Sequence, residues 1–402
     1  MSTPRQPDRR EVPIGRRVAQ LRVRRGMTQQ VFADRIGKSK SWVDKVERGV
    51  RTLDRLPMIE TVAAALGVTP GVLVGRQRQR TPTTDATTAV EHVRRALATY
   101  HSAYRDPTPS MIDLDHQIRY AHTAYQHAHH LQVLKMLPDL LTSTRQANHP
   151  TGGPSTAGLL IRVYRLTAHV LVKLGEPHLA WLAADRAMTT AEGDPHRTAL
   201  AAVPLAQALR ALQRGRLAMT AATTAAQPLD LAPHRALSPD DLALVGTLLT
   251  EAALAAATCG DATAADGLLD RAAHLATTHA ERQNHDHSFG PATVDLARAL
   301  AAAHLGDNHL AIAIHLRVTG GDAWHRLPAE HRAAHLLDAA RSYLDIGDPH
   351  NAARALVTAD HLAPTEVRLR PVTRTTVTAI LRTGTTPADL TTLATALGLT
   401  HR

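Results

Sequence analysis

The chain has 402 residues, of which 44% are hydrophobic and 20% are charged, so its composition is that of a globular protein and excludes the disordered and fibrous classes. Its single cysteine, Cys259, excludes an intrachain disulfide and a zinc site built on a cysteine pair. No uninterrupted apolar run reaches the roughly 18 residues that a membrane-spanning helix needs. We therefore expect a cytoplasmic protein.

The positive charge is confined to one end of the chain. Residues 1–80 hold 18 Lys and Arg against 7 Asp and Glu, and the remainder holds 28 against 29, so the formal net charge of +10 comes from the N-terminal end. Such a charge distribution favours DNA as a partner, because binding of a basic surface to a polyanion releases counterions and is therefore favourable. A membrane surface is the competing partner, and it is disfavoured because the basic region has no broad apolar helix face.

Residues 1–12 are polar and basic with several prolines, and we expect them to form a flexible arm. A first short helix is then indicated after Thr28, which is an N-cap residue type. Phe32 and Ile36 give this helix an apolar face, and Gly37, which can adopt a positive φ, predicts its end.

A second short helix is predicted between Ser39, which can cap it, and Gly49, which can end it. Val43 and Val46 share its apolar face. The face left for a partner carries Lys40, Ser41 and Lys45, and such side chains suit the major groove of DNA. On periodicity by itself, a solvated basic face explains these residues equally well.

Together with Arg22, Ala33 and the Glu47-x-Gly49 ending, this segment resembles the lambda-repressor and Cro type of helix-turn-helix, the XRE family. The resemblance covers residues 14–75, and we expect the domain to span 13–75. It implies that Arg22 pairs with Glu47 and that Gln29 meets a phosphate. Trp42 departs from the pattern, since many relatives hold a small polar residue there, and it is expected to pack on a sugar or a thymine methyl instead. The implied DNA-contacting residues are Gln29, Lys38, Ser39, Lys40, Ser41, Trp42, Lys45, Arg48 and Arg51.

Residues 76–88 form a polar, charged stretch with a proline and predict a linker, and residues 89–402 show helical periodicity almost throughout. Five glycine turns, spaced by 40, 45, 46 and 41 residues, separate long helical patterns from shorter ones: Gly175, Gly215, Gly260, Gly306 and Gly347. The pattern predicts antiparallel helical hairpins stacked in an α-solenoid, closed by a capping helix at 386–398. These units resemble tetratricopeptide repeats, although they exceed the ~34 residues of that repeat. The expected fold class is therefore all-α, a helix-turn-helix domain followed by a TPR-like solenoid.

A possible ligand site lies on the helix predicted around residues 159–174, where Arg162, Arg165 and His169 share a stripe that can hold an anion. The alternative is an ordinary solvated face. Four large aromatic residues are expected to pack in the core rather than to serve as ligand platforms: Tyr164, Trp181, Trp324 and Tyr343. Histidine pairs at helical spacing occur among the 25 histidines, but no catalytic or metal motif stands out, so we expect no enzyme, cofactor or metal site.

A DNA-reading head joined to a repeat unit predicts a nucleoid-associated transcription regulator. We expect the repeat unit to bind an effector, either a small molecule or a peptide, and to join two subunits on a palindromic operator. Two alternatives stay open: a non-catalytic adaptor that localises a captured protein on DNA, and an enzyme regulator or phosphatase-like repeat protein.

Overall fold

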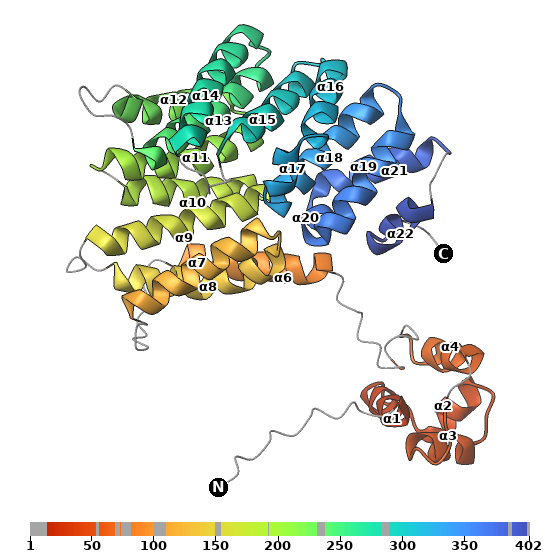
Figure 1. Cartoon of the computed structure of the whole chain (residues 1–402). Coiled ribbons are helices and arrows are strands. Elements are labelled where there is room, and N and C mark those ends of the chain that lie inside the picture. The colour runs from red at the N-terminus through yellow and green to blue at the C-terminus, as the bar shows by residue number, and fades with distance from the viewer. Residues whose placement is uncertain are drawn as a thin grey trace. The chain divides into compact units, whose positions relative to one another are not determined.

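The computed structural model describes residues 14–53, 56–68, 73, 82–99, 110–148, 154–191, 193–230, 238–282, 289–384 and 388–399. It divides into two compact units, residues 1–81 and 82–402. Every regular element in the described residues is a helix, which confirms the expected all-α class (Figure 1). The expected arm, residues 1–12, lies outside the described residues.

Unit 1 contains four described helices: α1 Ile14–Arg24, α2 Gln29–Arg35, α3 Lys40–Glu47 and α4 Leu56–Ala65. Their apolar faces enclose a small core that includes Phe32, Val43 and Leu73. α1 crosses α3 closely, because a Cβ added at Gly15 would lie 1.9 Å from the Val46 carbonyl oxygen. A glycine is therefore needed at this crossing.

Unit 2 begins with α6 Pro82–Ala98, so residues 82–88 of the expected linker are helical and residues 76–81 lie outside the described part. Pro82 suits the first position of a helix, where no backbone N–H is needed. The first half of the unit continues with α7 Met111–Gln126, α8 His130–Ala147, α9 Pro154–Lys173, α10 Pro177–Thr190, α11 Pro195–Ala211, α12 Gly215–Asp230, α13 Pro239–Thr258 and α14 Ala262–Arg282. The second half contains α15 Pro291–His304, α16 Asn308–Thr319, α17 Asp322–Arg326, α18 Ala329–Asp345, α19 Pro349–Leu362, α20 Pro364–Leu369, α21 Pro371–Arg382 and α22 Ala388–Ala396.

Successive helices of unit 2 pack as hairpins, as the repeated glycine turns predict. Gly175, Gly260, Gly306 and Gly347 each adopt a positive φ at the end of a helix. The turn near Gly215 differs: Gln213 takes the left-handed conformation at φ 59°, and Gly215 is the first residue of α12. A Cβ at Gly215 would lie 2.6 Å from Cys259 Sγ, so close packing explains this glycine.

The line of hairpins turns back on itself within unit 2. α20 contacts α6 and α8, and α18 contacts α7, so late helices lie beside the first ones (Figure 1). α13 is long and apolar enough to cross a membrane, but 72% of the relevant stretch is buried among other helices, which is the environment of a core helix.

Three of the four aromatic residues expected in the core are buried: Tyr164, Trp324 and Tyr343. The expectation for Trp181 is wrong, because this side chain on α10 is 46% exposed. Trp181 lines an open groove together with residues of α11 and α12, which leaves its ring partly uncovered.

Candidate functional site

The helix-turn-helix geometry begins with two capped helices in unit 1. The Thr28 hydroxyl accepts a hydrogen bond from the Val31 amide at 3.2 Å, which fixes the start of α2. Gly37, at φ 62°, ends the turn after α2. The Ser39 hydroxyl then accepts from the Trp42 amide at 3.2 Å, so Ser39 is the N-cap of α3.

α3 has one buried face and one exposed face. Val43 and Val46 are buried in the core of unit 1, and Trp42 is half-buried against that core. Seven of the nine residues implied to contact DNA are exposed: Lys38, Ser39, Lys40, Ser41, Lys45, Arg48 and Arg51. Within the described residues, Arg48 forms an ion pair with Asp44, while Lys40 and Lys45 have no ion-pair partner. These two lysines are therefore available to an anion.

The C-terminal end of α3 is fixed by the buried carboxylate of Glu47. Glu47 accepts from Arg22 Nε at 2.6 Å and from Arg22 Nη2 at 3.0 Å, so the structure brings this expected pair together. Arg22 also donates to the Met27 carbonyl at 2.7 Å, and the hydrogen bond to Glu47 raises the pKa of its guanidinium. The bidentate pair ties α1 to the C-terminal end of α3.

Gln29 contributes a third contact to Glu47 that the sequence did not predict. Its amide Nε2 donates to Glu47 Oε2 at 2.8 Å, and the side chain is half-buried. In this structure the Gln29 amide is bound to a side chain of the same unit. The phosphate contact implied for Gln29 stays a prediction.

The three residues expected to bind a ligand in unit 2 lie on α9, and two of them contact side chains of other helices. Arg162 forms an ion pair with Asp115 on α7, whose pKa it lowers. His169 is bound through Nδ1 to Gln207 Oε1 on α11 at 2.8 Å, and burial lowers its pKa to about 4. Burial also lowers the pKa of Arg165 to about 10, and its Nε has no hydrogen-bond partner among the described residues.

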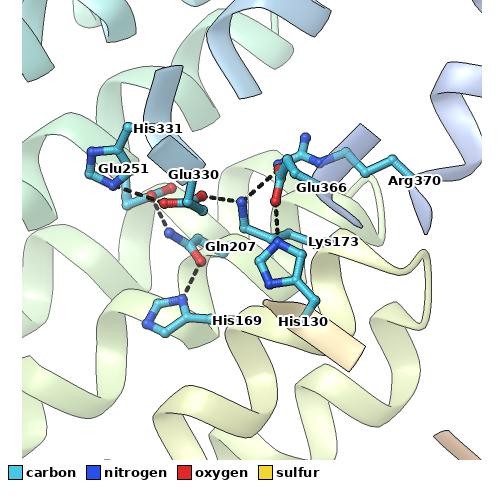
Figure 2. A network of polar contacts seen from close by, with 9 residues as sticks. All are labelled: His130, His169, Lys173, Gln207, Glu251, Glu330, His331, Glu366 and Arg370. Carbon is cyan, nitrogen blue, oxygen red and sulfur yellow. Dashed lines mark hydrogen bonds and ion pairs between the residues drawn. The ribbon is translucent and has the colours of Figure 1, made fainter. Parts of the chain in front are cut away.

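A buried polar network continues from this face of α9 to the late helices (Figure 2). Lys173, one turn after His169, forms an ion pair with Glu366 on α20 at 2.9 Å and another with Glu330 on α18. Glu366 also contacts His130 on α8 and Arg370, which follows α20. Through these contacts, the network joins α8 and α9 to α18 and α20.

A second branch of the network lies on α11 and α13. Gln207 donates to Glu251 Oε1 at 2.6 Å, and Arg210 donates to Glu251 Oε2 at 3.1 Å. Because Gln207 also binds His169, this branch meets the α9 stripe (Figure 2). The solvated-face alternative for that stripe is therefore wrong, since Arg165 and His169 are half-buried and face other helices.

The two carboxylates that contact Lys173, those of Glu330 and Glu366, are held in their charged form. Burial by itself raises the pKa of Glu366, but the charges of Lys173 and Arg370 lower it well below its usual range. The pKa of Glu330 is lowered in the same way, mainly by Lys173 against the effect of burial. A buried carboxylate remains charged only when such partners surround it.

Sequence reasoning missed Lys173, Glu330, Glu366 and Arg370. Lys173 carried a usable signal, because it continues the stripe of Arg165 and His169 at the next i+4 position. The acidic residues carried none, since Glu366 lies 193 residues after Lys173. No group of three or more metal-ligating side chains occurs in the part of the chain that the structure describes.

Comparison with known proteins bears on the N-terminal unit. Residues 13–76 match a family model described as a helix-turn-helix domain. A solved structure of PlcR from Bacillus thuringiensis, in complex with the peptide PapR7 and DNA, is similar at 15% sequence identity and a TM-score of 0.35, covering 67% of this chain and 97% of that chain. No curated protein sequence matches this chain. The N-terminal unit of the chain is therefore a helix-turn-helix DNA-binding domain.

Proposed function

We propose that the chain is a sequence-specific transcription regulator of the XRE type. In this proposal α3 enters the major groove, where Lys40, Ser41 and Lys45 contact base edges and neighbouring phosphates. The observation that supports it is the exposed face of α3, on which Lys40 and Lys45 have no ion-pair partner among the described residues. The opposite face is held in place by its apolar core and by Glu47.

In the proposed function, unit 2 has the regulatory role. It binds an effector, a small molecule or a peptide, and joins two subunits so that two heads read a palindromic operator. Half-sites about 34 Å apart would place both heads on one side of the duplex. Such a dimer acts on the chromosome, in the cytoplasm.

Mapping of the chromosomal sites occupied by the full-length protein, followed by binding to the recovered fragments, tests the proposal. The double substitution Lys40→Ala and Lys45→Ala should weaken binding at least about 30-fold, since each of the two base contacts contributes ~1–3 kcal/mol. Lys135→Ala is the matched control, because Lys135 is an exposed lysine on α8 in the other unit. Equal binding by the double variant and the wild type would exclude α3 as the DNA-reading helix.

The adaptor alternative makes a different prediction for the same protein. An adaptor would co-purify with a stoichiometric partner bound to unit 2. Deletion of the adaptor would leave transcription from the occupied promoters unchanged. A regulator should change that transcription without a second protein.

A further inference from the structure

A groove on unit 2 is lined by none of the residues of the buried polar network. α11 packs against both α10 and α12, and a cavity of about 760 Å³ is lined by residues of these three helices and of the α10–α11 turn. This volume lies in the range of sites that hold small organic molecules, ~300–1,000 Å³.

The groove presents apolar side chains to solvent. Trp181 on α10 and Leu217 on α12 are 46% and 58% exposed, and both line the cavity. Leu205 and Leu209 on α11, which also line it, are half-buried. An exposed apolar surface of this kind marks a binding site more often than a random surface position does.

The charge of the groove is negative. Asp185 and Asp194 are the charged residues in its lining. Asp194 has partners, because it forms an ion pair with Arg197 at 3.1 Å and caps α11. Asp185 lies one turn after Trp181 on α10, and its carboxylate has no hydrogen-bond or ion-pair partner among the described residues. The groove thus combines an open aromatic ring with an unbalanced carboxylate.

We propose that this groove binds a small organic cation with an apolar body. The apolar part packs on Leu205, Leu209 and Leu217, and the positive charge lies between Trp181 and Asp185. A cation is attracted both by the face of an indole ring and by a carboxylate, whereas an anion is repelled by each. This is a ligand class for unit 2 that goes beyond the proposed regulator, and binding is measured without DNA, so failure here leaves the DNA-binding proposal untouched.

Tetraphenylphosphonium and tetraphenylborate are suitable probes because they share a shape and differ in the sign of their charge. Titration of each into the full-length protein, followed by calorimetry, should show that the phosphonium binds at least about tenfold more tightly than the borate. Trp181→Ala should weaken phosphonium binding about tenfold, and Trp181→Phe should retain most of it. Asp185→Asn should weaken it about three- to fivefold, because this carboxylate is exposed to solvent.

Asp266→Asn is the matched control, since Asp266 is an exposed aspartate on α14 that does not line the groove and forms no ion pair with the described residues. It should leave phosphonium affinity unchanged. Circular dichroism of each variant verifies the helical fold. Equal affinity for the two probes, or binding that survives both Trp181→Ala and Asp185→Asn, would overturn the proposal. One further result would also overturn it. If the wild-type protein were a dimer that bound no phosphonium, and Trp181→Ala converted it to a monomer, the groove would be a subunit interface.

Discussion

Lys173 Nζ on α9 and Glu366 Oε1 on α20 lie 2.9 Å apart, although 193 positions separate the two residues in the chain. Glu366 is fully buried, and Lys173 is nearly so. The pair therefore joins an early hairpin of unit 2 to a late one.

Replacement of Lys173 with Met should lower the free energy of unfolding by about 3 kcal/mol, because Glu330 and Glu366 would keep their buried charges without the ammonium. Urea denaturation followed by far-ultraviolet circular dichroism measures this difference. Lys135→Met, at an exposed position, should change the same quantity by less than about 0.5 kcal/mol. A loss below about 1 kcal/mol in Lys173→Met would show that the ion pairs contribute little to stability.

Stability should fall between about pH 6.5 and pH 4, in part because of His335. This side chain is buried, its Nε2 lies 3.0 Å from His315 Nδ1, and burial lowers its pKa to about 3. A histidine that is neutral when folded takes up a proton on unfolding below its ordinary pKa of about 6.5, so acid favours the unfolded state. The stabilisation is complete above pH 6.5 and is lost as the pH falls towards the folded pKa.

His335→Gln should therefore reduce the slope of unfolding free energy against pH in this window, by about 1–3 kcal/mol between pH 6.5 and pH 4. The slope is the relevant readout, since the substitution also changes packing at every pH. His309→Gln, at an exposed histidine on α16, serves as the control. An unaltered slope in His335→Gln would assign the acid sensitivity to other groups.

Glu47→Ala should loosen α3, because Arg22 and Gln29 lose the carboxylate that both contact. Loss of a buried, charge-assisted contact costs roughly 2–3 kcal/mol. Hydrogen exchange at the backbone amides of Val43 and Val46 in the full-length protein should become faster by about 30- to 150-fold if they exchange through opening of unit 1.

Glu60→Ala is the control for that substitution, since Glu60 is an exposed residue of the same unit on α4. Its amide exchange in α3 should equal that of the wild type. If Glu47→Ala also exchanged at the wild-type rate, the Arg22 pairing would have no structural role in the domain.

Two helical glycines of unit 2 should respond to alanine with opposite signs. A Cβ at Gly246 on α13 would lie 2.0 Å from Phe289 Cζ, and Phe289 is buried, so Gly246→Ala should destabilise the unit by about 1–3 kcal/mol. A Cβ at Gly267 on α14 meets nothing within 4 Å, so Gly267→Ala should stabilise it by about 0.5–1 kcal/mol. Thermal unfolding of the two variants in parallel measures the contrast, and wild-type stability in Gly246→Ala would contradict the packing at Phe289.

Local signals explain why the head could be predicted. Thr28, Gly37 and Ser39 act within a turn of their own positions, and the structure has the expected caps and left-handed glycine there. The all-α class and the hairpin turns were predictable for the same reason. Physical information carried by a few adjacent residues is readable from a sequence.

The rest depends on tertiary neighbours. The sequence indicates that Gly215 is small but not that Cys259 lies against it, and it does not reveal that Trp181 faces an open groove. The partners of Lys173 could not be found, because any of the 36 acidic residues satisfies the charge requirement until the fold selects among them. Long-range pairings of this kind are decided by packing.

The contacts of α18 and α20 with α7, α8 and α9 alter how unit 2 should come apart. In an open array each repeat touches only its neighbours, so the ends can fray and the array can melt in stages. Here Lys173 on an early helix pairs with Glu330 and Glu366 on late helices, so releasing either end would remove the ammonium from both buried carboxylates. The closed arrangement thus couples both ends of the array and makes unit 2 lose its structure as a single cooperative body.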